Sequence, residues 1–347
     1  MIQPNPFLAE MLDTAAAGYG SFAARLLLQQ RPALKTTGNQ ALPNWRAHLT
    51  QKALELSTAV ALGRPAIFKQ RVLWAGRSFQ ARGLPLDDLA AGLACLQEVI
   101  RQKVSAPSPD AVMAILTEGI EALDQPLEQE AGLDGQDPQQ RLALVYLQQV
   151  LEGNAREATR LIVTAADEHA MEDIYLRVLM PAQAEVGRLW HAGELTIAEE
   201  HFVTATTERV MAVLANSVTP ERTIDSTVVA AAVAGNIHEL GIRSVADFFE
   251  MAGWHTVHLG ADVPPDEIAR GAQYFAADVV TLSVTLSTQI KVLKDSIAAV
   301  RRAAPEARII VGGVAMAELP DLWSEIGADA FAPNACDAVK VAESLLQ

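Results

Sequence analysis

The side chain with the clearest capacity for chemistry is the histidine of Asn236-Ile-His-Glu-Leu-Gly241. His238 follows an apolar, strand-like segment (Thr227–Gly235) and precedes an amphipathic, helix-like one (Gly241–Gly253). In α/β proteins the carboxyl ends of the strands open into the crevice that binds ligands. Imidazole is also a good ligand for transition metals. The pattern therefore predicts a metal-binding histidine at the carboxyl end of a first strand.

A second group of chemically capable side chains lies upstream, on a stretch with a helical pattern. His191 lies 47 residues before His238 and follows Trp190. Glu200 and His201 come next, with nine residues between Trp190 and Glu200. One histidine or tryptophan on a helix carries little information, so the spacing of the whole group is the useful signal.

The elements that must position these residues follow from hydrophobic periodicity. From residue 227 on, strand-like segments alternate with amphipathic helices, which predicts a doubly wound parallel sheet of flavodoxin-like type. The predicted strands are Thr227–Gly235, His255–Asp262, Asp278–Thr285, Arg308–Val314 and Asp329–Pro333, and the last helix runs from about Asn334 to Leu346.

Residues before 227 show helical periodicity, interrupted by Pro- and Gly-containing breaks. We expect an all-helical domain over 1–125, a linker over 126–137, a four-helix-bundle cap over 138–222 and the sheet domain over 225–347. The predicted helices are Phe7–Gln30, Asn44–Leu62, Pro65–Arg82, Pro85–Val104, Pro109–Leu123, 138–151, 154–168, 171–190 and 196–217.

Composition excludes several classes of protein. The net charge is −15, and residues 131–347 hold all of the imbalance, which disfavours direct binding to nucleic acid. No apolar run approaches the ~20 residues of a membrane span. The chain has two cysteines, Cys95 and Cys336, too few for a disulfide framework. We therefore expect a cytoplasmic protein that binds neither nucleic acid nor a membrane.

Together, the two groups resemble cobalamin-binding modules, in particular those of adenosylcobalamin-dependent photoreceptors. The family pattern Asp/Glu-x-His-x-x-Gly corresponds to Asn236-x-His238-x-x-Gly241. A Ser-x-Leu-like segment corresponds to Ser283-Val-Thr285-Leu, and a Gly-Gly pair to Gly312-Gly313. Asp262 fits the loop after the second strand. The resemblance covers about 138–347.

The resemblance implies that His238 is the lower axial ligand of cobalt and displaces the benzimidazole of the cofactor. The nucleotide tail then enters the sheet, where Ser283 can bind its base and Gly312 and Gly313 allow close approach. A metal-bound histidine needs a hydrogen-bond partner on its other nitrogen. That partner is usually a carboxylate, whereas this chain has Asn236.

The upstream group resembles the Trp-x9-Glu-His motif of photoreceptor helix bundles. By that resemblance Trp190 covers the upper face of the corrin, while Glu200 and His201 border the adenosyl group. His191 matches the position whose imidazole can become the upper cobalt ligand after light breaks the Co–C bond.

The amino-terminal domain resembles globin-related helical sensory domains that lack haem. Some of these bind a linear tetrapyrrole, and some are fused to cobalamin domains in receptors called photocobilins. Arg71 and Arg77, with Lys69 and Trp74 on the same predicted helix, are candidates to hold the propionates and ring of a bilin such as biliverdin. The alternative is a solvated basic face around a core tryptophan.

We therefore expect a light sensor, not an enzyme, in which photolysis of adenosylcobalamin moves the cap and alters association in a homo-oligomer such as a dimer. Two alternatives stay open. One is a corrinoid carrier for methyl transfer, against which the Trp-x9-Glu-His motif argues. The other is a cobalamin-sensing adaptor without photochemistry. The sequence does not name the downstream partner.

Overall fold

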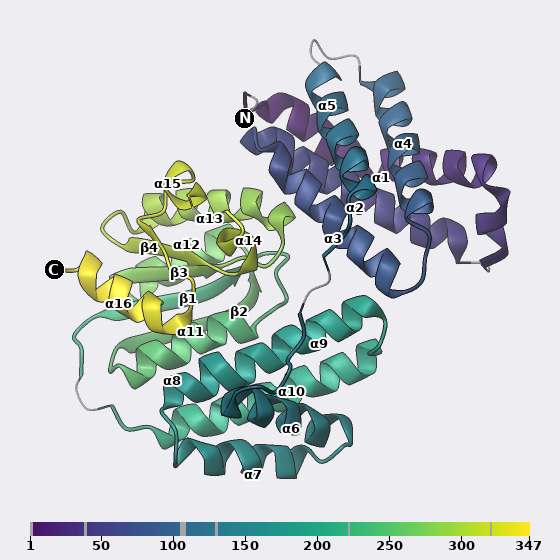
Figure 1. The fold of residues 1–347 in the computed structure, drawn as a ribbon. Helices are drawn as coiled ribbons and strands as arrows, with labels where there is room; N and C mark the ends of the chain where they lie inside the picture. The colour runs from purple at the N-terminus through teal and green to yellow at the C-terminus, as the bar shows by residue number, and fades with distance from the viewer. Residues whose placement is uncertain (1–2, 38–39, 105–108, 129–130, 221–222, 320) are drawn as a thin grey trace. The chain divides into compact units, whose positions relative to one another are not determined.

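The computed structural model describes residues 3–37, 40–104, 109–128, 131–220, 223–319 and 321–347. The chain divides into two compact units. In Figure 1 the colour runs along the chain, from purple at the N-terminus to yellow at the C-terminus. The first contains residues 1–130 together with His191–Glu194, and the second contains Ala131–Trp190 and Leu195–Gln347. Each unit is described by itself below.

The first unit is helical. Helix α1 begins where Asn5 accepts a hydrogen bond from the Leu8 backbone N–H and Pro6 takes the first helical turn. Gly63, with φ of +63°, ends α2 before Pro65 starts α3. The elements are α1 (Pro6–Gln30), η1 (Pro32–Thr37), α2 (Ala41–Leu62), α3 (Pro65–Ala81), α4 (Leu86–Lys103), α5 (Pro109–Glu121) and η2 (Ala122–Asp124).

The second unit begins with four helical stretches that pack around one apolar core. Its centre includes Tyr146, Tyr175 and Met211, all fully buried. Thr196 and Glu199 form a capping box that starts the last of the four helices. The elements are α6 (Pro138–Leu151), α7 (Ala155–Ala166), a continuous stretch of α8 (Met171–Asp173), the π-helical η3 (Ile174–Leu179) and α9 (Met180–Ala192), and then α10 (Ile197–Ser217).

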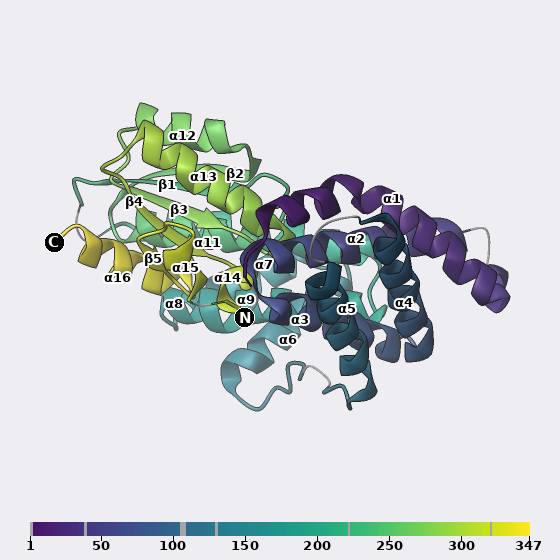
Figure 2. The same cartoon turned by 90° about the horizontal axis from the view of Figure 1, so that it is seen from above.

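A five-stranded parallel sheet follows, in the order β2-β1-β3-β4-β5. This is the predicted flavodoxin-like order. Figure 2 shows α12 and α13 on one face of the sheet and α11 and α16 on the other. The strands are β1 (Thr227–Val233), β2 (His255–Val263), β3 (Val279–Ser283), β4 (Arg308–Gly312) and β5 (Ala330–Phe331).

The central strands are buried on both faces, which explains why they are apolar throughout. Residues 228–233 of β1 and all five residues of β3 are buried. In register, Ala232 pairs with Ser283 and Ser283 with Gly312, so β1, β3 and β4 end together. The helices of this part are α11 (Leu240–Met251), α12 (Pro265–Tyr274), α13 (Ile290–Ala303), α14 (Val314–Ala317), α15 (Leu322–Glu325) and α16 (Ala335–Leu345), with the short η4 (Ser287–Gln289) before α13.

Several predicted details were wrong. Strands β1, β3 and β4 end two residues before the predicted ends, because the chain turns at their carboxyl edge. The sequence did not reveal the π-helical turn η3 or the short helices α14 and α15. The predicted domain boundaries stay a prediction, and residues 105–108, 129–130 and 221–222 of those ranges lie outside the described residues.

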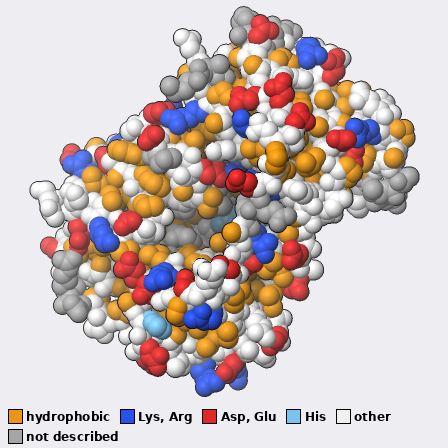
Figure 3. Space-filling model, in the orientation of Figure 1, with side chains coloured by type: hydrophobic (Ala, Val, Ile, Leu, Met, Phe, Trp, Pro, Cys, Tyr) orange, Lys and Arg blue, Asp and Glu red, His pale blue; other side chains and the backbone are white. Residues whose placement is uncertain are grey.

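The visible surface carries charges of both signs. In Figure 3, Lys and Arg side chains alternate with Asp and Glu side chains among the described residues of that face. The expectation that the protein does not bind nucleic acid stays a prediction. Within the described residues, no helix is both long and apolar enough to cross a bilayer.

The turn after β4 generates a stability prediction. Gly313 has φ of +93° and ψ of 170°, and an added Cβ would lie 2.2 Å from the Val284 carbonyl oxygen. We expect Gly313→Ala to lower the free energy of unfolding by about 1–3 kcal/mol, since this backbone region is essentially restricted to glycine. Urea unfolding measures the change.

Gly187→Ala is the matched control. Gly187 lies in α9, and nothing is within 4 Å of an added Cβ. Its replacement should raise stability by up to about 1 kcal/mol. Equal unfolding midpoints for Gly313→Ala and the wild type would contradict the structural account of the turn.

Candidate functional site

His238 lies in an exposed loop at the carboxyl end of β1. The strand stops at Val233, the chain turns through Gly235, whose φ is +78°, and α11 begins at Leu240. His238 is exposed, whereas Asn236 beside it is fully buried. The loop thus presents an imidazole at the edge of the sheet where parallel α/β proteins bind ligands, as the sequence predicted.

Asn236 contacts the imidazole as the sequence predicted. Its Oδ1 lies 3.3 Å from His238 Nδ1 and also accepts the His238 backbone N–H at 3.3 Å. Its Nδ2 donates to the Ser283 carbonyl oxygen at 3.1 Å. Since Nδ1 is engaged by Asn236, Nε2 is the nitrogen left for a metal. An aspartate at this position has no donor for the Ser283 carbonyl.

The predicted polar residues after β3 lie at the same edge. Ser283 ends the strand and is 8% exposed, and Thr285 is partly buried in the loop that follows. The structure adds Ser287, whose buried Oγ has no hydrogen-bond partner within the described part of the chain. A buried hydroxyl without a partner is costly, so a polar group of a ligand there would be favourable.

The predicted glycines lie at turns. Gly312 pairs with Ser283 across β3 and β4, and an added Cβ at Gly312 would lie 3.0 Å from the Ala332 carbonyl oxygen. At Gly313 the obstacle is the Val284 carbonyl. Protein packing alone therefore requires glycine at Gly313, a reason the sequence did not reveal. Gly241 is exposed in the first turn of α11, with open space around it.

Exposed apolar side chains accompany His238 at this edge. Ile237 is 75% exposed, Val314 56% and Leu286 38%, and they follow β1, β4 and β3, respectively. Large exposed apolar side chains that gather at one place mark a binding surface. One imidazole, this apolar rim and the unsatisfied Ser287 hydroxyl together fit a flat, largely apolar metal macrocycle with a polar tail.

The predicted cap residues belong to the helical part of the second unit. Trp190, near the end of α9, is 40% exposed. At the start of α10, Glu200 contacts His201 Nδ1 with one carboxylate oxygen and accepts the Thr204 hydroxyl with the other at 2.9 Å. His201 is exposed and Glu200 half-buried. Their predicted contacts with an adenosyl group stay a prediction.

His191 packs with the first unit. Its ring stacks on Trp74, with centroids 3.6 Å apart and an interplanar angle of 17°. Its carbonyl accepts hydrogen bonds from Ser78 Oγ and Arg82 Nε. Burial, assisted by surrounding cations with Arg82 first among them, lowers the pKa of His191 to about 4. The imidazole is therefore neutral at pH 7, as metal ligation requires; its role as an upper ligand stays a prediction.

The predicted bilin-binding residues share α3. Arg71, Trp74 and Arg77 are all partly buried, and the Arg71 guanidinium lies 6.0 Å from the centroid of the Trp74 ring. One face of Trp74 is in contact with His191, so a pyrrole ring could not pack there without displacing that imidazole. Lys69 forms an ion pair with Glu118 at 3.5 Å. Arg71 and Trp74 are thus in contact, but bilin binding stays a prediction.

A buried polar contact that the sequence did not reveal joins the bundle to the sheet domain within the second unit. Tyr175, in the π-helical turn, donates to Asp247 Oδ2 of α11 at 2.8 Å and lies 3.1 Å from the Met211 carbonyl oxygen. Burial raises the pKa of Asp247 to about 6, although the Tyr175 hydrogen bond and Arg243 oppose the shift. No sequence pattern identifies this pair, because the two residues are 72 positions apart.

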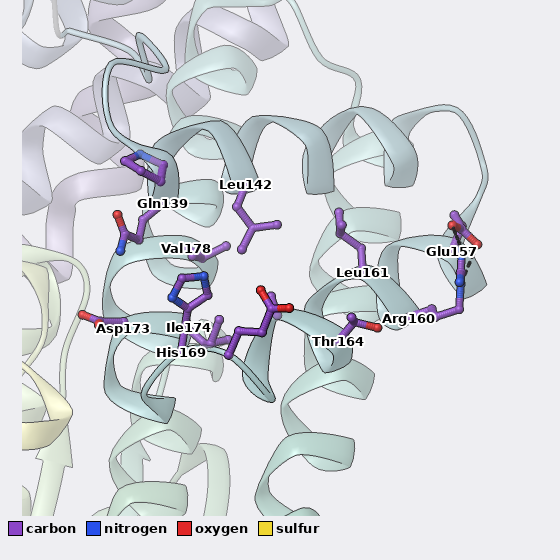
Figure 4. A pocket seen from close by; sticks show the side chains of 13 residues that line it. Gln139, Leu142, Glu157, Arg160, Leu161, Thr164, His169, Asp173, Ile174 and Val178 are labelled. Atoms are coloured by element: carbon purple, nitrogen blue, oxygen red, sulfur yellow. Dashed lines mark hydrogen bonds and ion pairs between the residues drawn. The ribbon is translucent and has the colours of Figure 1, made fainter.

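A cavity of about 420 Å³ lies elsewhere in the second unit, between α6, α7 and the π-helical turn. Figure 4 shows Leu142, Leu161 and Ile174 lining it and the ion pair of Glu157 with Arg160 at one end. None of the predicted site residues lines this cavity. It is therefore separate from the edge that presents His238.

The raised pKa of Asp247 generates a prediction about pH. Its folded-state pKa, about 6, exceeds the ordinary 3.8, so the unfolded chain releases this proton first as pH rises. The stability contribution is therefore complete below about pH 4 and is lost as pH rises through 6. We expect a loss on the order of 3 kcal/mol, which Asp247→Asn abolishes because an amide oxygen still accepts from Tyr175.

The measurement is urea unfolding of the wild type and Asp247→Asn between pH 4 and 7.5. The difference between the two proteins isolates Asp247 from other carboxylates. Parallel pH profiles for the two proteins would show that Asp247 titrates normally and would refute the prediction.

Comparison with known proteins identifies matching domains in the second unit. Two models, each described as a B12 binding domain, match residues 226–341 and 145–215. A corrinoid protein of Desulfitobacterium hafniense is 26% identical over 207 residues, which cover 57% of this chain and 94% of that protein. Dimethylamine corrinoid protein 1 of Methanosarcina acetivorans is 28% identical, with 58% and 97% coverage.

Two further matches establish the family and the fold. Dimethylamine corrinoid protein 3 of Methanosarcina mazei is 30% identical over 117 residues, 33% of this chain and 68% of that protein. The structure of the monomethylamine corrinoid protein of Methanosarcina barkeri has a TM-score of 0.52 at 23% identity and covers 59% of this chain and 99% of its own. The chain therefore belongs to the cobalamin-binding family defined by the B12 binding domain, and its cofactor is a corrinoid.

Proposed function

We propose that the protein is a corrinoid carrier in which His238 is the lower ligand of cobalt. The observation that carries the proposal is the Asn236–His238 contact, which engages Nδ1 and leaves Nε2 for the metal. When bound, a corrinoid supplies a cobalt centre that takes up a methyl group and hands it on. The chain's own part is to hold that cofactor, and separate partner enzymes carry out the transfers.

The edge of the sheet supports this role through its apolar rim. Ile237, Leu286 and Val314 offer apolar contact to a corrin ring. Relatives named for dimethylamine and monomethylamine favour methylated amines as the source of the methyl group. We propose that this chain is not an enzyme by itself, because in the carrier proposal its site residues hold the cofactor rather than a substrate.

A second candidate function, a light sensor with adenosylcobalamin, is favoured by the residues of α9 and α10. Trp190 is a large, 40% exposed aromatic, and Glu200 is positioned by Thr204 and His201. These are the side chains expected around an adenosyl group. The corrinoid proteins described above align with at most 59% of this chain, so an additional helical region remains for a sensory role.

In the light-sensor proposal the helical first unit is an input or output module, and its predicted resemblance to globin-related sensory domains suits that role. His191, which stacks on Trp74, would supply the imidazole that ligates cobalt after photolysis. A biliverdin could be held by Arg71 and Arg77, and the signal would pass through a change in a homo-oligomer, as expected for a cytoplasmic receptor. The chemistry of the downstream partner follows from neither proposal.

The lower ligand is tested by His238→Ala. We expect the substituted protein to lose the absorbance spectrum of histidine-bound cobalamin and to bind the cofactor at least tenfold more weakly, because one metal–ligand bond is removed. His255→Ala is the control, since His255 is the first residue of β2 and lies at the amino end of the strand, whereas His238 lies at the carboxyl edge of the sheet. If His238→Ala matches His255→Ala in spectrum and affinity, His238 is not the ligand.

The two functions are separated by the upper ligand of the bound corrinoid. The apoprotein is titrated with methylcobalamin and adenosylcobalamin, and the molecular mass of each complex is measured by light scattering in the dark and after green light. The carrier predicts a dissociation constant for the methyl form no larger than for the adenosyl form, and a mass that does not respond to light.

Strong preference for adenosylcobalamin together with a light-dependent change in mass would overturn the carrier in favour of the sensor. His191→Ala, compared with the surface variant His169→Ala, then tests the proposed upper ligand. Under the sensor proposal only His191→Ala should change the spectrum of the illuminated product.

A further inference from the structure

The backbone of Gly235, the residue that turns the chain after β1, is held from both sides. Its N–H donates to Asp262 Oδ1 at 2.7 Å, and its carbonyl oxygen accepts from Gln289 Nε2 at 2.8 Å. Asp262 lies in β2, and Gln289 lies in η4 after β3. Because β1 is the strand between β2 and β3, the two side chains reach Gly235 from opposite neighbours. We call this pair of side chains the Gly235 clamp.

The Gln289 side chain can make all of its contacts because its amide carries both a hydrogen-bond donor and an acceptor. It is 6% exposed. Its Oε1 accepts the backbone N–H groups of Thr285 at 3.0 Å and Leu286 at 2.9 Å, while Nε2 donates to Gly235. The amide thus ties the loop after β3 to the loop after β1. A glutamate keeps the two acceptor contacts but has no donor for the Gly235 carbonyl.

Asp262 holds the same loop through its side chain and its backbone. Its carboxylate accepts the Gly235 N–H, and its own N–H donates to the Asn236 carbonyl oxygen at 3.0 Å. It does so at φ of +56°, in the left-handed region that Asp and Asn tolerate better than most residues. The left-handed backbone conformation of Asp262 is a second indication that this residue is needed to hold the loop after β1.

The loop held in this way carries His238. Asn236 is one residue from Gly235, is fully buried and contacts the imidazole. A shift of the Gly235 backbone would move Asn236 with it and would change the direction of the imidazole. A ligand that is already oriented binds more tightly, because binding loses less conformational freedom.

We propose that Gln289 and Asp262 are positioning residues that fix the segment Gly235–His238 in the geometry required for cobalt ligation, without touching cobalt themselves. This inference rests on the proposed role of His238 as lower ligand. Under this inference Asp262, which the sequence suggested as a cofactor contact, instead positions the loop. The inference also adds Gln289, which no motif identified.

The test uses electron paramagnetic resonance of the full-length protein, labelled with ¹⁵N-histidine and loaded with unlabelled cobalamin in the Co(II) state. An axial ¹⁵N nucleus from His238 splits the cobalt lines into doublets, whereas the ¹⁴N of the cofactor's own base gives triplets. The fraction of doublets therefore measures histidine ligation directly, independently of any activity.

Gln289→Glu and Asp262→Gly each remove one side of the clamp. Gln273→Glu adds the same charge on the exposed surface of α12, and Asp262→Asn keeps an oxygen acceptor, so these two are the matched controls. Glycine tolerates the backbone of residue 262, which separates loss of the hydrogen bond from backbone strain. We expect the ratio of histidine-bound to histidine-free cobalt to fall about tenfold or more in Gln289→Glu and Asp262→Gly, but not in the controls.

The outcomes separate the inference from the proposed function. Doublets in the wild type with an unchanged ratio in both Gln289→Glu and Asp262→Gly would overturn the clamp alone. A wild type without doublets would overturn His238 as ligand and the clamp with it. If Gln289→Glu does not fold, the comparison of Asp262→Gly with Asp262→Asn decides the question by itself.

Discussion

Strand β1 has a hydrogen-bonded neighbour on each side, and this constraint determines where the imidazole of His238 can be held. The loop after a central strand lies between the ends of β2 and β3, so both can supply side chains to it. Asp262 and Gln289 contact the Gly235 backbone, and Asn236 links the loop to Ser283. The loop is exposed to solvent at Gly235 and His238, and yet it is anchored by the fully buried Asn236 and the buried Gln289. The direction of the imidazole is therefore set by contacts within the protein itself.

The requirements for binding a corrinoid are met partly by the cofactor itself and partly by the protein. The macrocycle supplies most of the metal ligands, so the protein would need only one imidazole, an apolar rim and polar contacts for a tail. These are the features found at His238, at Ile237 and Val314, and at Ser287. The helical part of the second unit adds Trp190 and Glu200, and the contact of Tyr175 with Asp247 connects it to the helix that follows His238.

Sequence periodicity predicted the long elements and failed at short or irregular ones. Helix α3 begins at the predicted Pro65, and the sheet has the predicted order, because a proline start and fully buried strands leave strong local signals. Helices α14 and α15 have four residues each, too few to show a period. The His238–Asn236 contact was predictable because the two residues are close in sequence. The contact of Gln289 with Gly235 spans 54 positions, and the stack of His191 on Trp74 is likewise a tertiary contact, so neither left a local pattern.

The central claim is that the loop carrying His238 is ordered by protein contacts before any cofactor binds. Amide hydrogen exchange of the apoprotein tests this most directly, because the N–H groups of Gly235, Asn236 and His238 donate to Asp262, Val233 and the Asn236 side chain, respectively. The account predicts that these three amides exchange far more slowly than those of an unstructured peptide, and that added cobalamin changes their protection little. Exchange at the unstructured rate in the apoprotein, with protection appearing only when cobalamin is added, would contradict it.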